Sequence, residues 1–223
     1  MRLYKTTKSV LSVSPEPVKF LNGLTSNSLD KPRNAFLNIH GRIVATFDQL
    51  KIRDDTYFLV LEQAFVGDVL AHIDRFVKLS KAVVRPEDYS VYFDLDKAYA
   101  TGRDEYIIEQ QAGRIVITRK HLDINVDDEA FTLFRLRNNI PLQGADYRNE
   151  LLLNVSEDEF VSFTKGCYLG QEPVSKVHHK SKPTWKLMVK YESECSKDEK
   201  AKMTSRAKDE KGRVLGFTFA RNA

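Results

Sequence analysis

The amino-acid sequence predicts an α+β fold built from antiparallel sheets and packed helices, and three observations support this. Short segments in which apolar and polar residues alternate, as in half-buried strands, recur along the 223 residues. The predicted helices are few and do not alternate regularly with the strands, which argues against a βαβ winding. A hydrophobic content of 42% is sufficient for a substantial core in a chain of this length.

The first half of the chain predicts a short helix, a long helix and a run of strands. Alternation over residues 3–13 predicts the first strand, and a proline-containing turn at 14–17 leads into the short helix. Apolar side chains at three- and four-residue spacing predict the long helix over 62–78. Further strands are expected at 35–39 and 43–52, with Gly41 at the bend of a hairpin, and at 57–61, 81–84, 90–94, 106–109 and 114–118.

The second half predicts two more helices around a turn. Asp127 and Asp128 are placed to cap a helix that continues through Leu136. Residues 161–163 are typical of a strand end and are followed by a tight turn. Residues 171–180 then predict a short helix with a proline in its first turn.

The C-terminal segment differs in composition from the rest. Residues 194–211 are almost all charged or small, so we expect a solvated linker followed by one final strand. The predicted organisation is a body over residues 1–190 and, over residues 191–223, a charged loop with a single strand.

Composition favours a reducing compartment, and we expect the cytoplasm. The two cysteines, Cys167 and Cys195, cannot form a disulfide framework and lack zinc-ligand spacing, so no metal site is predicted. The N-terminus has no continuous apolar region like that of a signal peptide, and no run approaches the roughly 18 apolar residues of a membrane span. A net charge of +4 allows an anionic partner without requiring one.

The segment KGCYLGQE, residues 165–172, is the strongest candidate for chemistry. A turn bent at Gly166 would set the thiol of Cys167 just before a helix N-terminus, where backbone N–H groups and Lys165 favour the thiolate. Gln171 and Glu172 would add an amide and a carboxylate at the same place. The alternative is that Cys167 is a small buried hydrophobic residue, the usual role of a free cysteine.

A basic face follows this segment along the chain. Such a face could hold an anionic tail or phosphate groups, although ordinary solvated surface is the simpler interpretation. Two adjacent histidines and one cysteine do not make a metal site without a remote donor. The residues concerned are Lys176, His178, His179, Lys180, Lys182 and Lys186.

Several segments together resemble the YgfZ family of folate-binding iron–sulfur assembly proteins, which are relatives of the glycine-cleavage T-protein. Residues 163–172, FTKGCYLGQE, are similar to the family signature, and FLNGLTSN at 20–27 is similar to its helix–loop. LNIHGR at 37–42 resembles the family hairpin. The segments at 134–141 and 212–217 resemble two further family motifs. The resemblance therefore extends over nearly the whole chain.

The resemblance implies a GcvT-like folate-binding body followed by a C-terminal β-barrel, here shortened to a remnant. It implies tetrahydrofolate or a derivative as cofactor, and iron–sulfur proteins or assembly factors as partners. It also implies a role in maturing iron–sulfur enzymes, including one that modifies tRNA. No direct DNA or membrane contact is expected, and the chain could form an oligomer. Carried over by motif, the functional thiol is Cys167 beside Lys165, and the cofactor-binding residues are Asn27, Asn38, Thr46, Asp48, Asn154, Tyr168, Gln171, Glu172 and Lys176.

The sequence departs from the family at three positions. Thr46 stands where the T-protein has an aspartate that it needs for catalysis, and a hydroxyl cannot replace a carboxylate as proton acceptor, so aminomethyl transfer is not expected. Asp48 lies two residues further on, on the same strand face, and is a substitute carboxylate. Leu152 replaces an acidic or polar residue that faces the pterin. Lys176 replaces an arginine, keeping the charge without the planar fork.

Three functions remain open at this point. The first is a folate-binding accessory protein of iron–sulfur assembly that acts through Cys167. The second is a folate-dependent one-carbon transferase that uses Asp48. The third is a scaffold that has kept the fold and lost the ligand.

Overall fold

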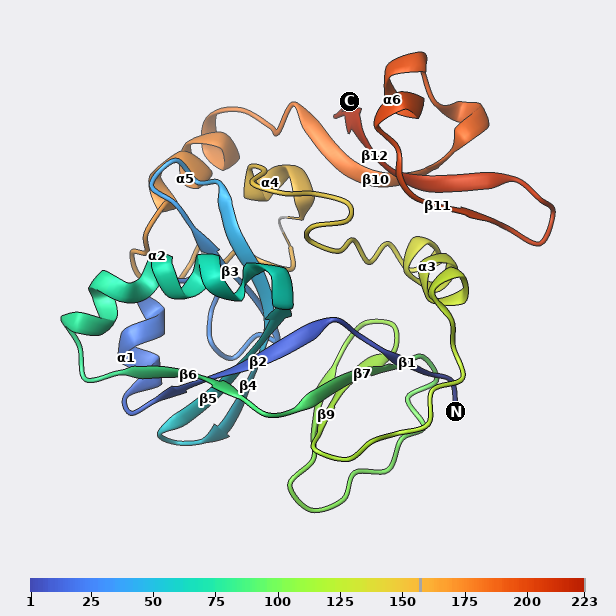
Figure 1. Ribbon diagram of the computed structural model, residues 1–223. Coiled ribbons are helices and arrows are strands. Elements are labelled where there is room, and N and C mark those ends of the chain that lie inside the picture. The colour runs from blue at the N-terminus through green and yellow to red at the C-terminus, as the bar shows by residue number, and fades with distance from the viewer. Residues whose placement is uncertain (157, 223) are drawn as a thin grey trace.

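The computed structural model describes residues 1–156 and 158–222 and contains three antiparallel sheets with helices packed around them (Figure 1). The five-stranded sheet has the order β3-β4-β5-β2-β6, the four-stranded sheet β1-β7-β9-β8 and the three-stranded sheet β10-β12-β11. In chain order the strands are β1 Leu3–Lys5, β2 Lys8–Ser14, β3 Arg33–Leu37, β4 Ile43–Arg53, β5 Thr56–Glu62, β6 Val83–Glu87, β7 Ser90–Asp94, β8 Tyr106–Glu109, β9 Arg114–Thr118, β10 Trp185–Tyr191, β11 Thr204–Lys208 and β12 Val214–Arg221.

The helices cover the sheets and fill the gaps between them. Helix α2 buries Val69 and Ile73 against the five-stranded sheet, in a cluster that includes Phe36 and Phe47. None of the helices in the described residues is long and apolar enough to cross a membrane. The helices are α1 Pro17–Asn22, α2 Val66–Lys78, α3 Asp128–Arg137, α4 Leu152–Val155, α5 Gln171–Lys180 and α6 Lys197–Lys202, with 3₁₀ turns at Gln63–Phe65 and Glu192–Glu194.

The N-terminal strand predicted over 3–13 is in fact two strands in two different sheets. The break falls at Thr6 and Thr7. The Thr6 N–H donates to the Val91 carbonyl in the four-stranded sheet at 3.0 Å, whereas the Thr7 carbonyl accepts from the N–H of Gln63, just after β5, at 3.1 Å. Both strands have the same alternating pattern, so the sequence period does not reveal where the chain changes partners. This crossover joins the two sheets of the body.

The charged C-terminal segment is folded, contrary to the solvated linker predicted over 194–211. Ser196 and Glu199 form a capping box that begins α6, with the Ser196 Oγ accepting from the Glu199 N–H at 3.3 Å. Strand β11 follows and pairs with β12. The three-stranded sheet begins at Trp185, before the boundary between body and C-terminal segment that is predicted at residue 190. The position of that boundary stays a prediction. Residues 161–163, predicted as a strand end, form no strand.

A buried ion pair ties the three-stranded sheet to α3. The Arg135 Nη1 donates to the Asp146 Oδ2 at 2.8 Å, and both side chains are almost fully buried. The other oxygen of Asp146 accepts from the Thr204 hydroxyl on β11 at 2.9 Å. The Arg135 Nη2 donates to the Ser205 hydroxyl at 2.9 Å. The carboxylate of Asp146 therefore hydrogen-bonds to both the body and the C-terminal sheet.

Candidate functional site

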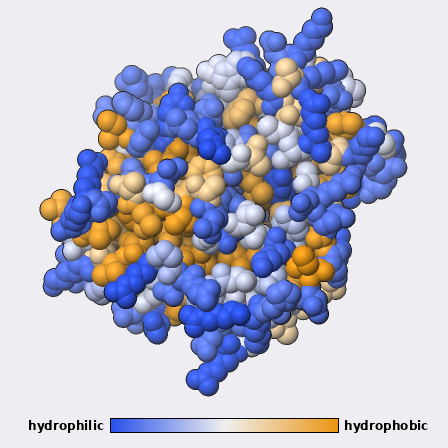
Figure 2. Space-filling view, viewed as in Figure 1, coloured by the Kyte–Doolittle hydropathy of each residue, from blue (hydrophilic) through white to orange (hydrophobic). Residues whose placement is uncertain are grey.

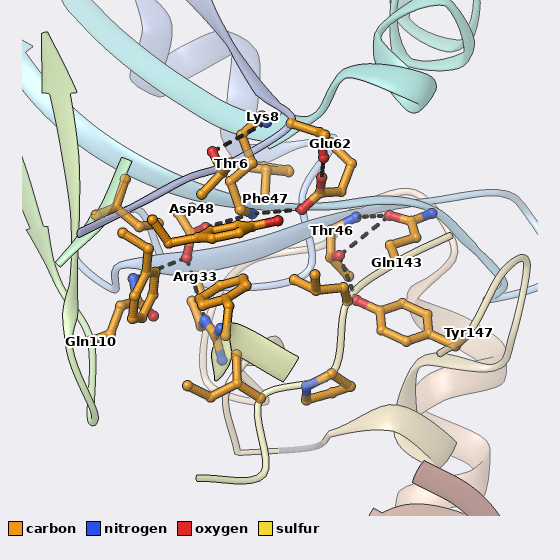
Figure 3. Close-up of a pocket in the computed structure, with 18 of the residues that line it drawn as sticks. Thr6, Lys8, Arg33, Thr46, Phe47, Asp48, Glu62, Gln110, Gln143 and Tyr147 are labelled. Carbon is orange, nitrogen blue, oxygen red and sulfur yellow. Dashed lines mark hydrogen bonds and ion pairs between the residues drawn. The ribbon is translucent and has the colours of Figure 1, made fainter. Parts of the chain in front are cut away.

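The candidate site is a pocket between the five-stranded sheet, the four-stranded sheet and the chain after α3 (Figure 3). Its cavity volume is about 60 Å³, and the pocket opens to solvent. Its walls come from both ends of the body's sequence, so only the folded chain assembles them. The residues that line it are Tyr4, Thr6, Thr7, Lys8, Arg33, Thr46, Phe47, Asp48, Glu62, Phe93, Gln110, Ile115, Phe131, Ile140, Pro141, Leu142, Gln143, Tyr147 and Phe160.

A network of charges around Asp48 forms one side of the pocket. The strand register places Arg33 opposite Asp48 and Lys8 opposite Glu62, so each cation faces a carboxylate across a ladder. Asp48 is 3% exposed, and its carboxylate accepts from the Lys8 Nζ at 3.2 Å and the Arg33 Nε at 3.4 Å. It also accepts from the Gln110 Nε2 at 3.1 Å. Both carboxylate oxygens are therefore occupied.

The two cations of this network are held in their charged forms. Burial by itself lowers the pKa of Lys8, but the nearby carboxylates of Asp48 and Glu62 outweigh it and raise that pKa. The pKa of Arg33 is raised in the same way, against burial, by Asp48 and Glu159. The pocket thus presents fixed positive charges beside fixed acceptors.

A second polar group surrounds Thr46. Its backbone N–H donates to the Gln143 Oε1 at 2.8 Å, and its hydroxyl lies 2.6 Å from the Tyr147 hydroxyl. Burial raises the pKa of Tyr147 far above its usual range, so this phenol stays protonated. Thr46 and Asp48 line the same pocket, as does Phe47 between them.

Aromatic rings also line the pocket. Tyr4 and Phe131 stack with ring centroids 3.9 Å apart, and Phe93 lies 5.4 Å from Phe131. Phe160 also lines the pocket, with the Arg33 guanidinium 5.5 Å from its ring centroid. A flat ligand would find apolar faces here and polar partners across the pocket.

The signature segment lies apart from this pocket. Cys167 is exposed, so the alternative that it is a buried hydrophobic residue is wrong, but it does not line the pocket. The Lys165 Nζ donates to the carbonyls of Thr25 at 2.6 Å and Asn27 at 2.9 Å, and it lies 5.3 Å from the ring centroid of Tyr168. Burial lowers the pKa of Lys165 to about 8 and raises the pKa of Tyr168 to about 12.

The bend in the signature is made by Gly170, not by Gly166 as predicted. Gly166 has no left-handed backbone, and nothing lies within 4 Å of where its side chain would begin. Gly170 has φ +82° and precedes α5 as its N-cap. A Cβ there would strike the Asn38 carbonyl oxygen and lie 2.9 Å from the Leu37 Cβ. This glycine lets the signature pack against the hairpin between β3 and β4.

Asn27 connects the signature to the pocket wall through backbone contacts. Its side-chain Nδ2 donates to the carbonyls of Arg33 and Glu159, each at 3.0 Å. The neighbouring Ser26 hydroxyl donates to the Phe160 carbonyl at 2.6 Å. The loop that Lys165 holds therefore also holds two residues beside the charge network.

Asn38 and Asn154 make local hydrogen bonds. The Asn38 Oδ1 accepts from the backbone N–H groups of His40 at 2.9 Å and Arg42 at 3.1 Å, which shapes the hairpin turn. The Asn154 Nδ2 donates to the Glu150 Oε1 at 3.1 Å. Neither asparagine lines the pocket.

The remaining predicted residues lie on α5. Gln171 and Glu172 occupy its first turn, and Lys176 is exposed further along it. The predicted bounds of this helix, 171–180, are those observed. The structure thus places Thr46 and Asp48 in the pocket, and the other predicted site residues outside it.

Sequence reasoning missed the five pocket residues that hydrogen-bond to Asp48 or Thr46. Each stands alone in a strand or loop and belongs to no motif, so only the strand register and the fold reveal its partners. They are Lys8, Arg33, Gln110, Gln143 and Tyr147. Among the described residues, no group of three His, Cys, Asp or Glu side chains could hold a metal ion.

Comparison with known proteins agrees with the resemblance. No family model matches the chain. The chain is 24% identical, over 78% of its length and 58% of the relative's, to the iron–sulfur cluster assembly factor IBA57 homolog, mitochondrial, of Dictyostelium discoideum. It is 20% identical to an uncharacterized protein of Haemophilus influenzae, over 63% of this chain and 52% of that protein. The chain therefore spans little more than half the length of these relatives.

The fold has a counterpart among solved structures. The glycine cleavage system aminomethyltransferase T from Bartonella henselae matches with a TM-score of 0.71 at 11% identity, covering 98% of this chain and 78% of that one. The α+β fold with antiparallel sheets is thereby confirmed. The chain thus resembles an IBA57 homolog in sequence and shares the fold of a glycine cleavage system aminomethyltransferase.

Proposed function

We propose that this protein is an accessory factor of iron–sulfur cluster assembly that binds a reduced folate in the pocket and uses Cys167 as its functional thiol. The main support for folate binding is the pocket itself, which contains Thr46 and Asp48 and lies in a chain with an aminomethyltransferase fold. The assembly half is supported by sequence similarity to an assembly factor and by the signature around the exposed Cys167.

The residues of the pocket fit a folate. A reduced pterin presents N–H donors, and the carboxylate of Glu62 on the pocket wall is an acceptor. The stacked rings of Tyr4 and Phe131 suit the flat pterin and benzoyl groups. When bound, a reduced folate supplies a one-carbon unit or reducing equivalents.

The same geometry argues against a transferase. A general base needs a free lone pair directed at the reacting proton. The carboxylate oxygens of Asp48 already accept from Lys8, Arg33 and Gln110. Thr46 has a hydroxyl that is engaged with Tyr147. The chain's residues can bind and orient a ligand here, and neither Thr46 nor Asp48 is placed to accept a proton.

The thiol and the pocket would act at different places. Cys167 is exposed and can reach a partner protein, whereas the pocket lies elsewhere, between the sheets of the body. The two places are joined by contacts: Lys165 holds Asn27, whose side chain holds Glu159, and Glu159 pairs with Arg33 at 2.6 Å. Folate binding could thereby stabilise the loop on which the signature rests.

The folate half is tested by calorimetric titration with tetrahydrofolate. Gln110→Leu removes one hydrogen bond to Asp48 inside the pocket, and we expect roughly five- to tenfold weaker binding. Gln111→Leu is the matched control, because this neighbour does not line the pocket, and its affinity should equal that of the unmodified protein. Equal affinities for both variants, or no affinity for tetrahydrofolate at all, would reject the pocket as a folate site.

The thiol half is tested by complementation. Cys167→Ala should bind tetrahydrofolate normally, because the residue lies outside the pocket, yet fail to restore iron–sulfur enzyme activity in cells that lack the native protein. Full complementation by this variant would remove the thiol from the proposal. Full complementation together with absent folate affinity would favour a scaffold that has lost its ligand.

A further inference from the structure

A hollow with an apolar floor lies between α1 and the C-terminal end of α2 (Figure 1). Its volume is about 590 Å³, and it opens to solvent. Phe20, Leu24 and Ala82 line it and are buried in the hydrophobic cluster that packs α2 on the five-stranded sheet. Phe76 of α2 also lines the hollow and packs against that cluster. The floor is therefore held in place by the core. We call this site the α1–α2 hollow.

An exposed leucine extends the apolar surface at the edge of the hollow. Leu79 lines the hollow, follows α2 directly and is 87% exposed. Figure 2 shows hydrophobic side chains gathered over α2 and β6, on the left of the view, and Leu79 lies in the segment that joins these two elements. A single exposed leucine needs no explanation. A leucine beside a hollow with an apolar floor adds to a surface that a partner would cover.

Lysines stand around the hollow. Lys19, Lys78 and Lys81 line it, and Glu16 is the one carboxylate among its described lining residues. Lys81 forms no ion pair within the part of the chain that the structure describes. Lys78 pairs with Asp74 at 2.5 Å and Lys19 pairs with Glu16 at 3.9 Å, in both cases between exposed side chains. Exposed pairs of this kind contribute little to stability, so both lysines can change partners. The rim of the hollow therefore has an excess of positive charge.

The α1–α2 hollow adjoins the signature segment. Gly23 lines the hollow, and its carbonyl accepts from the Leu169 N–H at 3.0 Å. On the other side of Cys167, the Lys165 Nζ donates to the Thr25 carbonyl at 2.6 Å. Cys167 is two residues from each of these anchors, so its Cα lies within about 8 Å of theirs. The exposed thiol is therefore held near the wall of the hollow.

We infer that the α1–α2 hollow is the docking site for an acidic amphipathic helix of an iron–sulfur protein, and that docking brings this partner to Cys167. The second half rests on the proposed function, since it takes Cys167 as the functional thiol. An amphipathic helix lays its apolar face into a hydrophobic groove. Acidic side chains on the flanks of that helix match the lysine rim, and complementary charge of this kind favours encounter and fixes the register.

A lipid surface and a small anion fit this site less well. Binding to a bilayer surface buries an apolar face that protrudes. Among the described apolar side chains that line the hollow, only Leu79 is largely exposed, whereas Phe20 and Leu24 form a buried floor. A small anion would use the lysines and leave the apolar floor uncovered. The convex face of a helix uses both.

The first experiment measures the binding of a labelled helical peptide by fluorescence anisotropy. The probe is a synthetic helix of about 18 residues, with leucines at i, i+3, i+4 and i+7 spacing and glutamates on both flanks. Leu79→Ser should weaken its binding roughly tenfold, because the leucine is covered on docking. Ile124→Ser is the matched control, because Ile124 is 55% exposed and lies outside the hollow, and this variant should bind like the unmodified protein.

Charge reversal tests the rim. Lys19→Glu with Lys81→Glu should weaken binding of the acidic peptide roughly tenfold and strengthen binding of a peptide in which lysines replace the glutamates. Lys5→Glu with Lys211→Glu reverses two exposed lysines outside the hollow and should do neither. Equal effects of the two double variants would overturn the inference. So would Leu79-dependent binding to phosphatidylglycerol vesicles in place of the peptide, which would identify a lipid surface. Thermal unfolding verifies that each variant is folded.

A thiol-exchange experiment tests whether docking reaches Cys167. The acidic peptide carries a terminal cysteine as a mixed disulfide with thionitrobenzoate. The Cys167 thiolate attacks the peptide sulfur, a new disulfide forms, and thionitrobenzoate leaves with the electron pair and is measured by its absorbance. The rate should exceed that of a peptide with serines in place of the leucines roughly a hundredfold. Cys167→Ala should abolish it, since Cys195 is buried. Equal rates for the two peptides would show that the hollow does not deliver a partner to this thiol.

Complementation separates this inference from the proposed function. Leu79→Ser should bind tetrahydrofolate normally, because the residue lies outside the folate pocket, and should fail to restore iron–sulfur enzyme activity in cells that lack the native protein. Ile124→Ser should restore it. Full complementation by Leu79→Ser would reject the hollow as the docking site and leave the role of the thiol untouched. Full complementation by Cys167→Ala would reject the thiol, and with it the delivery to Cys167, while peptide binding in the hollow would stand.

Discussion

Replacing Gly170 by alanine tests most directly whether this glycine forms the bend of the signature motif. Gly170 has φ +82°, a conformation that costs an L-residue about 1–2 kcal/mol. The new Cβ would also strike the Asn38 carbonyl oxygen and approach the Leu37 Cβ to 2.9 Å. The obstacles are backbone and a short Cβ, which cannot swing aside, and overpacking of this kind costs about 1–3 kcal/mol.

The two effects together predict a loss of about 3–4 kcal/mol in the free energy of unfolding. For a chain of 223 residues this corresponds to a fall in Tm of roughly 10 °C. Urea unfolding followed by circular dichroism measures the free energy, and a thermal scan measures the Tm. The contacts that the substitution disturbs join the signature to the hairpin. The loss in unfolding free energy should therefore be largely independent of any ligand.

The neighbouring glycine of the same motif is the control. Gly166 has no positive φ and open space where a Cβ would lie. Gly166→Ala should therefore change stability by no more than about 0.5–1 kcal/mol, with a gain as the expected direction because alanine restricts the unfolded chain. If Gly166→Ala destabilised the protein as much as Gly170→Ala, the assignment of the bend to Gly170 would be refuted.

Three further changes have expected outcomes. Arg135→Met should cost about 3–5 kcal/mol in urea unfolding, because it leaves the carboxylate of Asp146 buried without its cation; a loss below about 1 kcal/mol would contradict this. Burial lowers the pKa of Lys165 to about 8, from its ordinary value of 10.5. The charged amine therefore destabilises the folded state below pH 8, and this destabilisation decreases as the pH rises. Stability relative to Lys165→Met should therefore increase between pH 7 and pH 9.5, by up to about 2 kcal/mol, and a flat difference would be inconsistent. Ser196→Ala should cost about 1 kcal/mol by removing the capping box of α6, whereas an unchanged midpoint would show that the helix does not need it.

Much of the fold follows from local pattern. Strands at 90–94 and 114–118 and the helix at 171–180 have the predicted bounds, because apolar alternation, caps and a first-turn proline act within each segment. The Asp127 side chain accepts from the Ala130 N–H at 2.8 Å, as its capping position predicts. Local signals of this kind survive in the folded protein.

The errors arise where distant contacts decide. The change of sheet at Thr6 and Thr7 depends on partners in two other strands, and no local signal marks it. The charged segment after residue 194 folds because a few isolated side chains in it, among them Met203 and Ala207, are buried. A few buried residues of this kind do not change the average composition of a charged segment, so composition does not reveal them.

The candidate site shows the same division. Thr46 and Asp48 were found because a motif and the strand period placed them together. Lys8 and Gln110 could not be found in this way. Lys8 reaches Asp48 across the intervening strand β5 of the same sheet, and Gln110 reaches it from the turn after β8 in the other sheet. The motif led to these two residues of the pocket, whereas the folded strands bring the surrounding cations to them.

The passage of the N-terminal segment between two sheets has a practical consequence. Strand β1 covers one edge of the four-stranded sheet by pairing with β7. Deleting the residues before Lys8 would expose the hydrogen-bonding groups of β7 as an open edge, which is a template for association with other chains. A shortened protein would then be prone to aggregate, and an N-terminal extension should be attached through a flexible spacer that leaves this edge covered.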